Sequence, residues 1–310
     1  MGKEVLISFQ DVIKKFGKRE IIKDLKMDID AGDFVGVVGV SGSGKTTLLN
    51  MLVGYWKPSK GQILFDGNNI WKRRNFVSHF FGFSSQAGST YDNLTVLENL
   101  RYFGKLYNMP RKEINERSKE LLEFVELTGN ENLLASEMST GMQRRLDIAC
   151  AMVHDPEVLI LDEPTKDLDP FLRKEVLAML RKFNEAGTTI IMTSHLLGEI
   201  ESVSNKIAIL HNGSIICCDS PLNIKERYSH DDELQLKTQP GDYTKLAEEL
   251  KSLNMNRVII KPNGLVAYTN NAARVLPRLC DIAQQNNEHI LELKVAKPSM
   301  EEIFEAVTKR

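Results

Sequence analysis

The sequence predicts an α/β fold with a mainly parallel sheet, followed by a smaller α+β domain. Short apolar, β-prone runs alternate with helix-periodic segments over the first two thirds of the chain, which is the order that builds βαβ units. These runs are continuously apolar, as strands buried on both faces of a parallel sheet are. After Ser220-Pro221 the pattern changes to shorter strands and two amphipathic helices. We therefore expect a domain of residues 1–225 and an appendage of residues 226–310.

In the first domain, short strands and turns precede a helical segment. Strands are expected at Val5–Phe9, Ile21–Ile29, Phe34–Val38 and Gln62–Phe65. From about residue 92 to 153, apolar residues recur every three or four positions, which predicts a helical subdomain. Further strands are expected at Val158–Leu161, Thr188–Thr193 and Ile207–Leu210, with a helix at Leu172–Asn184 between the first two.

The appendage has the order β-α-β-β-α-β, which predicts a ferredoxin-like fold. Its strands are expected at Leu234–Thr238, Arg257–Lys261, Leu265–Thr269 and Ile290–Val295, and its helices at Tyr243–Leu253, Ala272–Asn286 and Met300–Lys309. The last helix carries an apolar stripe of Met300, Ile303, Phe304 and Val307. Two interpretations of this stripe stay open: it packs onto a second subunit, or it covers the sheet of its own domain.

Composition excludes several classes of protein. A net charge of −2 gives no general electrostatic attraction for nucleic acid, so we expect no nucleic-acid partner. No apolar run approaches the 18 or more residues that span a bilayer. The four cysteines show no metal-type spacing. The N-terminal residues lack the apolar core of a signal peptide, and we expect a cytoplasmic protein.

The segment from Gly39 to Thr46, Gly-Val-Ser-Gly-Ser-Gly-Lys-Thr, is the most informative motif. It fits the phosphate-binding pattern G-x-x-x-x-G-K-[ST] and lies between an expected strand and an expected helix. The glycines let backbone N–H groups turn toward phosphates, and the helix N-terminus adds positive potential. Lys45 is expected to reach the β- and γ-phosphates and the Thr46 hydroxyl to hold Mg²⁺. The motif therefore predicts a nucleoside triphosphate site.

A pair of carboxylates, Asp162 and Glu163, follows the expected strand Val158–Leu161. Buried parallel strands deliver their next side chains to the edge of the sheet where ligands bind. We expect Asp162 to serve Mg²⁺ through water or in its outer shell. Glu163 would polarise the water that attacks the γ-phosphate, because in-line phosphoryl transfer needs a positioned nucleophile and a metal clamp.

A set of further motifs resembles the ATPase subunits of ATP-binding-cassette (ABC) transporters, over roughly residues 4–220. The segment Ser139-Thr140-Gly141-Met142-Gln143-Arg144-Arg145 resembles the family signature. Gln86 resembles the Q-loop glutamine, Leu168-Asp169-Pro170 the D-loop, and His195 the switch histidine. Phe16 stands 29 residues before Lys45, at the position of the aromatic residue that stacks on adenine.

The resemblance implies a fold, ligands and roles for named residues. The fold would be a P-loop NTPase cassette with a mainly parallel core sheet, an antiparallel β-subdomain and a helical subdomain. The ligands would be ATP and Mg²⁺, in an Mg²⁺-dependent ATPase. Catalytic roles would fall to Glu163, His195, Gln86 and Lys45, and metal contacts to Thr46, Gln86 and Asp162. ATP contacts would come from Phe16, Gly39, Val40, Ser41, Gly42, Ser43, Gly44, Lys45, Thr46, Thr47, Ser139, Gly141 and Met142. In the family, ATP is shared between two subunits, so Ser139 and Gly141 would act across a dimer.

The closing segment Lys297–Phe304 resembles the tail of daunorubicin-resistance-type exporter ATPases for drugs and lipids. This favours an exporter ATPase that works with a second copy of itself or a homologous subunit and with a separate membrane permease. The chain would then lie on the cytoplasmic face of the membrane, bound to its permease. An importer ATPase with a solute-sensing C-terminal domain is the alternative. Cassette ATPases of DNA repair or translation are disfavoured, because the chain has one cassette, no zinc pattern and no heptad run.

Overall fold

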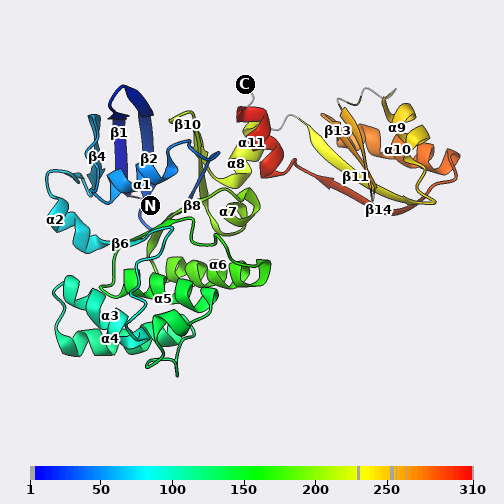
Figure 1. Cartoon of the computed structure of the whole chain (residues 1–310). Coiled ribbons are helices and arrows are strands. Elements are labelled where there is room, and N and C mark those ends of the chain that lie inside the picture. Colours follow the sequence, from blue (N-terminus) through cyan, green and yellow to red (C-terminus); the bar gives the residue numbers. More distant parts are fainter. Residues whose placement is uncertain (1–3, 229–230, 252–254, 256, 263, 309–310) are drawn as a thin grey trace. The chain divides into compact units, whose positions relative to one another are not determined.

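The computed structural model describes residues 4–228, 231–251, 255, 257–262 and 264–308. The chain divides into two compact units, Met1–Ser220 and Pro221–Arg310 (Figure 1). Residue 225, near which the sequence analysis places the boundary, lies inside helix α8 (Pro221–Tyr228). Each unit has its own apolar core.

The first unit contains the expected mainly parallel sheet. Its strand order is β10-β9-β3-β8-β7-β6, and all neighbours except β9 and β10 are parallel. The strands are β3 (Phe34–Val38), β6 (Phe81–Ser84), β7 (Val158–Asp162), β8 (Thr189–Ser194), β9 (Lys206–His211) and β10 (Ser214–Asp219). Strand β6 was not among the expected strands, because it is short and contains Gly82. A Cβ on Gly82 would lie 2.2 Å from the backbone oxygen of Ala151, so the glycine permits close packing beneath α5.

A second, antiparallel sheet has the order β2-β1-β4-β5. It comprises β1 (Val5–Phe16), β2 (Arg19–Asp30), β4 (Lys60–Phe65) and β5 (Asn68–Asn69). Strand β1 extends seven residues beyond its expected end, since the register shifts between Phe9 and Val12 where Asp11 has a φ of 49°. This irregularity interrupts the alternation on which the expectation rests. Helix α1 (Lys45–Leu52) contacts β2 and β7, one strand from each sheet, and shares a single apolar core with them.

The helical subdomain is built from α3 (Val96–Leu106), α4 (Arg111–Phe124) and α5 (Thr140–Met152). Thr95 and Glu98 form a capping box at the start of α3, and α3 contacts both α4 and α5. The remaining helices of the unit are α2 (Arg74–Val77), α6 (Pro170–Glu185) and α7 (Leu197–Val203). Helix α6 begins directly after the D-loop-like segment, with Asp169 as its N-cap.

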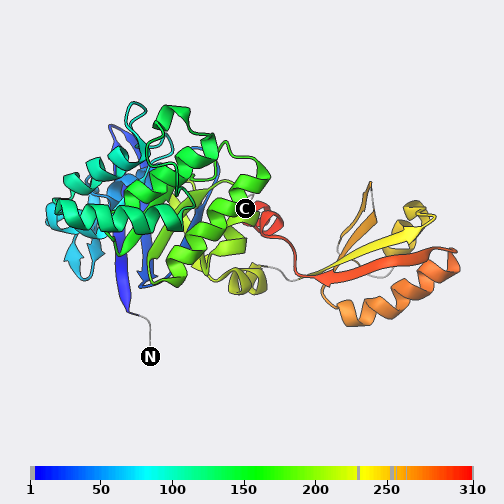
Figure 2. The ribbon, with the colours of Figure 1, turned by 90° about the horizontal axis from the view of Figure 1, so that it is seen from below.

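The second unit has the ferredoxin-like strand order β12-β13-β11-β14, with antiparallel neighbours throughout. Its elements after α8 are β11 (Asp232–Gln239), α9 (Tyr243–Lys251), β12 (Arg257–Lys261), β13 (Gly264–Thr269), α10 (Ala272–Gln285), β14 (His289–Ala296) and α11 (Met300–Thr308). Residues of α9 and α10 share one core with Leu234 and Leu236 of β11, so both helices cover the same face. Figure 2 shows β11 and β14 side by side, with α10 along them. Two expectations, on the helix ends Leu253 and Lys309, fall outside the described residues.

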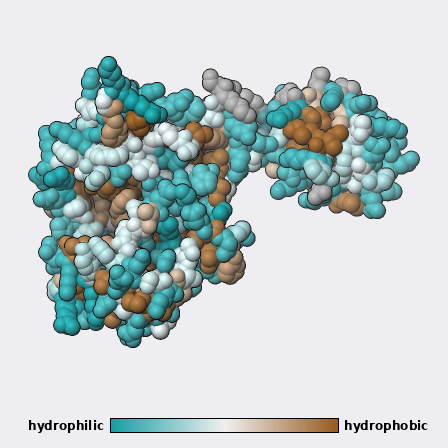
Figure 3. All heavy atoms as spheres, in the orientation of Figure 1, coloured by the Kyte–Doolittle hydropathy of each residue, from teal (hydrophilic) through white to brown (hydrophobic). Residues whose placement is uncertain are grey.

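The apolar stripe of the last helix is covered within the chain itself. Met300, Ile303 and Val307 are buried in the monomer, and α11 contacts α8. Phe304 is half-buried, so three of the four stripe residues are buried in the single chain, and packing of the stripe onto a second subunit stays a prediction. The view in Figure 3 shows hydrophilic residues over much of the surface, with hydrophobic patches on both units. Among the described residues, no helix has the length and apolarity needed to cross a membrane.

Candidate nucleotide-binding site

The glycine loop between β3 and α1 has the backbone conformation that phosphate binding requires. Gly42 and Gly44 have φ values of 78° and 109°, which favour glycine, and Gly44 is the N-cap of α1. Lys45 is buried, and its Nζ donates to the backbone oxygens of Gly39 at 2.8 Å and Val40 at 3.4 Å. Burial lowers the pKa of Lys45, while the nearby charges of Glu163 and Asp162 oppose this shift. The loop thus holds a desolvated ammonium at a helix N-terminus.

A cavity of about 390 Å³ lies beside this loop. Its lining comes from the β1–β2 hairpin, the glycine loop, the loop after β6 and the end of β7: Phe16, Arg19, Ile21, Ser41, Gly42, Gly44, Lys45, Thr46, Thr47, Gln86 and Glu163. Seven of the predicted ATP-contacting residues are therefore brought together with three of the predicted catalytic residues: Gln86, Glu163 and Lys45, which belongs to both sets. Arg19 and Ile21 also line the cavity, although no motif marked them.

Glu163 lies at the centre of the predicted catalytic group. Its carboxylate is 3.8 Å from Lys45 Nζ and 3.4 Å from His195 Nδ1. Its φ of 49° is uncommon for a residue with a side chain. Backbone strain of this kind gathers at functional sites.

Thr193, at the end of β8, orients the two carboxylates. Its hydroxyl donates to Asp162 Oδ1 at 2.6 Å and accepts from the backbone N–H of Glu163 at 2.9 Å. Asp162 is buried and is not among the residues that line the cavity, which agrees with the outer-shell role expected for it. The segment Thr193-Ser194-His195 resembles the switch-histidine motif, but sequence reasoning gave Thr193 itself no role, because its partner Asp162 lies 31 residues away in the chain.

Gln86 belongs to a loop that α5 holds in place. Arg144 of α5 donates to the backbone oxygens of Ser85 and Gln86 at 3.4 and 3.3 Å. Asp147, buried one turn later, accepts from the Ser84 hydroxyl and from the Ser89 backbone N–H. Burial raises the pKa of Asp147, and these hydrogen bonds oppose the shift. The helix that carries the signature-like motif thus also positions the glutamine.

The signature-like residues are separate from this cavity in the single chain. Ser139 is the N-cap of α5, and its hydroxyl accepts from the Met142 backbone N–H at 3.3 Å. Thr140, which stands where the family's commonest signature has glycine, is the first helical residue of α5. Ser139, Gly141 and Met142 are not in the cavity lining, so the monomer brings them to no nucleotide site of its own.

Glu199 of α7 joins three segments that surround the catalytic group, and sequence reasoning missed it. Its carboxylate accepts from the Thr165 hydroxyl at 2.6 Å and the Ser194 hydroxyl at 3.4 Å, and it lies 3.6 Å from Arg173 Nη1. Arg173 in turn donates to the backbone oxygen of Leu168 at 2.7 Å. The side chain therefore ties the segment after Glu163, the D-loop-like segment and the residue before His195 to one another.

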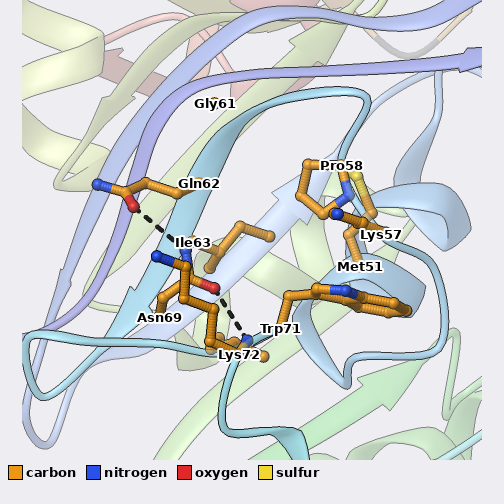
Figure 4. A pocket seen from close by; sticks show the side chains of 10 residues that line it. Met51, Lys57, Pro58, Gly61, Gln62, Ile63, Asn69, Trp71 and Lys72 are labelled. Atoms are coloured by element: carbon orange, nitrogen blue, oxygen red, sulfur yellow. Dashed lines mark hydrogen bonds between the residues drawn. The ribbon is translucent and has the colours of Figure 1, made fainter.

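A second cavity, of about 260 Å³, is lined by residues from the end of α1 to the segment after β5 and is shown in Figure 4. Met51, Lys57, Asn69, Trp71 and Lys72 are among the side chains around it. It contains none of the predicted site residues, and we assign it no part in nucleotide binding.

Comparison with known proteins decides the family. The ABC transporter family model matches residues 22–166. The chain is 31% identical over 308 residues to the linearmycin resistance ATP-binding protein LnrL of Bacillus subtilis (strain 168), covering 98% of this chain and 99% of the relative. The chain belongs to the ABC transporter ATPase family. It is accordingly a P-loop ATPase that uses ATP with Mg²⁺, and the ATP-binding subunit of a transporter.

Other relatives of this ABC ATPase carry the names of export and transport systems. It is 30% identical to the bacitracin transport ATP-binding protein BcrA of Bacillus licheniformis, over 96% of each chain. It is also 30% identical to the Nod factor export ATP-binding protein I of Rhizobium sp. (strain N33), over 99% of this chain and 98% of the relative. Among solved structures, the dimeric bacterial ABC transporter cassette MJ0796 matches with a TM-score of 0.63 and 27% identity, over 69% of this chain and 98% of that one.

The residues present fit the ligands that the family implies. Ser43 Oγ is buried at the loop and has no hydrogen-bond partner among the described residues. The Thr46 hydroxyl, the Gln86 amide and the Glu163 carboxylate open on the same cavity and are hard oxygen donors, the type that Mg²⁺ prefers. No group of three or more His, Cys, Asp or Glu side chains in the described ranges forms a closed metal cage. Mg²⁺ held by few protein ligands together with substrate phosphates needs none.

Proposed function

We propose that this ABC ATPase powers export of a small molecule, peptide or lipid through a separately encoded permease. The observation that carries the catalytic part is the convergence of Lys45, Glu163 and His195 beside the glycine loop. The direction of transport rests on the relatives, because full-length relatives are named for linearmycin resistance, bacitracin transport and Nod factor export. The tail Lys297–Phe304 supports the same direction.

The phosphate end of the cavity binds and orients the triphosphate. Backbone N–H groups of the glycine loop and of the start of α1 would bind the phosphates, and Lys45 would pair with the β- and γ-phosphate oxygens. Thr46, Gln86 and, through water, Asp162 would hold the metal. Bound Mg²⁺ would neutralise charge on the phosphate oxygens during transfer. At the other end of the cavity, the ring of Phe16 stacks on the base.

Glu163 acts as the base that polarises the attacking water, and His195 holds Glu163 in line. Glu163 Oε2 lies 3.4 Å from His195 Nδ1, and Lys45 Nζ lies 3.8 Å from the other oxygen of the same carboxylate, Oε1. Thr193 fixes the backbone of Glu163 and the carboxylate of Asp162 together, so the base and the metal residue keep a constant separation. Gln86 would connect the γ-phosphate side of the nucleotide site to the permease.

The active form is a head-to-tail dimer. Ser139 and Gly141 at the N-terminus of α5 would contact the γ-phosphate bound by the second subunit, which accounts for their distance from the cavity in one chain. ATP then holds the subunits together and hydrolysis releases them. The permease places this assembly at the cytoplasmic face of the membrane.

Two measurements test this function. The purified full-length chain should release phosphate from ATP only with Mg²⁺, and Lys45→Ala should abolish both ATP binding and phosphate release. An affinity-tagged chain should co-purify from detergent-solubilised membranes with a polytopic membrane protein, and loss of either gene should raise intracellular accumulation of the exported compound. Co-purification with ribosomes or DNA-repair complexes, with no membrane protein, would contradict a transport role.

A further inference from the structure

The base-binding end of the cavity depends on a residue from a distant part of the chain. Phe16 lies next to the turn of the β1–β2 hairpin, where Gly17 has a φ of 57°, and its side chain is 41% exposed. An aromatic ring at an exposed hairpin tip has few neighbours that limit its rotation. The ring therefore needs support before it can offer one face to a base.

Trp56 supplies this support. Its ring packs edge-on against Phe16, with centroids 4.7 Å apart and planes at 74°. Lys14 Nζ lies 4.8 Å from the centroid of Phe16 and 5.9 Å from that of Trp56, so a cation and an indole together hold the phenyl ring. Trp56 itself packs partly into the main core of the unit.

The segment that carries Trp56 is tied to both ends of the nucleotide site. At one end, the backbone N–H groups of Tyr55 and Trp56 both donate to the backbone oxygen of Asn50 in α1, the helix that begins at Lys45. At the other end, Lys14 Nζ donates to the backbone oxygen of Lys57 at 2.8 Å, and the Ser59 backbone N–H donates to that of Ile13 at 2.7 Å. The residues from Gly54 to Ser59 thus connect the phosphate helix to the strand that carries Phe16.

We propose that Trp56 is a positioning residue for nucleotide-base binding: it holds Phe16 in the orientation in which the free face of the ring takes the base. This inference rests on the proposed role of Phe16 at the base and extends it to a residue outside every motif of the sequence. Trp56 is not among the residues that line the cavity, so it would act on the base through Phe16. Removal of the Trp56 ring should therefore lower the affinity for the base. It should leave the affinity for the phosphates and the rate of the chemical step unchanged.

The test compares a ligand that has a base with one that has none. In the full-length protein, Trp56→Leu should raise KM for ATP about five- to tenfold, the scale of a base–aromatic stacking contact, with kcat almost unchanged. Inorganic tripolyphosphate, as a competitive inhibitor of ATP hydrolysis, should keep its parental inhibition constant, because the glycine loop is intact. Trp56→Phe keeps an aromatic edge against Phe16 and should recover most of the affinity for ATP.

Trp71→Leu is the matched control, since Trp71 lies over the second cavity with Arg74 against its ring and should leave both ligands unaffected (Figure 4). Phe16→Leu should reproduce the effect of Trp56→Leu on ATP. Equal weakening of ATP and tripolyphosphate in Trp56→Leu, or parental KM values in it, would overturn the inference while leaving the ATPase function intact. Failure of the parental protein to hydrolyse ATP would instead overturn the proposed function. If Trp56→Leu does not fold, the same comparison of ligands is made in Trp56→Met, which fills the site without an aromatic edge, and a parental KM for ATP there again overturns the inference.

Discussion

Buried carboxylates occur in both units of the chain, and they serve different purposes. In the first unit, Asp162 and Glu163 lie at the end of a parallel strand, and Glu163 contacts Lys45 and His195 at the mouth of a cavity. In the second unit, Glu288 is buried as well, but its oxygens accept from the backbone N–H groups of Gly241 and Asp242. Glu163 faces a ligand site, whereas Glu288 completes the hydrogen bonds of a turn. Burial of a charge therefore indicates a site only when its partners are themselves side chains around a cavity.

The prediction with the largest expected effect tests this difference by neutralising one carboxylate in each unit. Glu163→Gln should lower kcat by about 100-fold or more, since it removes the group that polarises the water, and ATP binding should persist and favour a stable dimer. Glu288→Gln, the matched change in the second unit, should leave kcat at the parental value. Steady-state phosphate release measures kcat of both variants, and size-exclusion chromatography with ATP detects the stable dimer. Parental activity in Glu163→Gln would refute the assignment of the base.

The second prediction asks whether the site is completed across the dimer. Lys45→Ala and Ser139→Ala should each be inactive alone, because each removes one side of both composite sites. An equal mixture should regain about a quarter of the parental activity, as random pairing of two-fold dimers leaves one intact site in half of them. A titration of one variant into the other, with mixed dimers shown by differently tagged subunits, measures this. No recovery in the presence of mixed dimers would mean that the sites are not shared.

The third prediction contrasts a half-buried histidine of the first unit with an exposed one of the second. His154 stacks on Tyr107, with ring centroids 3.4 Å apart, and its Nε2 lies 3.2 Å from the Phe81 backbone oxygen. Burial lowers the pKa of His154 to about 4, and the charges of His79 and Arg117 add to this. Because the native pKa lies below the unfolded value near 6.5, the unfolded state takes up the proton first, and native stability falls as the pH drops from about 6.5 to about 4.

His154→Phe should remove this acid sensitivity while keeping the stack on Tyr107. Between pH 8 and pH 5, the parent should lose about 2 kcal/mol more of its unfolding free energy than the variant does. Urea unfolding at each pH measures the difference. His289→Phe, on the exposed edge residue of β14, is the control and should lose stability with pH as the parent does. An equal loss in the parent and His154→Phe would show that the ring is protonated freely in the native state.

The smallest effect is expected from removing the second unit altogether. Met300, Ile303 and Val307 are buried in the monomer, and the two units have separate cores, so a chain ending at Ser220 should retain ATPase activity within about twofold. Specific activity should also stay constant across protein concentration. A defect that shrinks as concentration rises would show that the second unit stabilises the dimer, because dimer stability depends on protomer concentration.

Contiguous motifs and periodic patterns were sufficient for much of the fold and for the phosphate end of the site. The glycine loop, β3, α1 and the strand that ends in Asp162 are each local, so their residue types and spacing already specify their geometry. The β-α-β-β-α-β order of the second unit was equally legible, because its short β-prone runs and amphipathic helices follow one another along the chain in that order. Strand β6, with four residues and a glycine, and the irregular second half of β1 were not, since neither shows a sustained period.

Tertiary structure alone decided which distant residues support those motifs. Thr193 reaches Asp162 because β7 and β8 are parallel neighbours, Glu199 reaches Thr165 from the helix after β8, and Trp56 reaches Phe16 across forty residues of chain. Thr193 lies in a strand, Glu199 on a short helix and Trp56 shortly after a helix. The sequence around each of these residues has no pattern that predicts its partner. The reason is physical: a motif records the conformation of its own backbone, whereas a contact between segments depends on strand order and packing, which are properties of the whole folded unit.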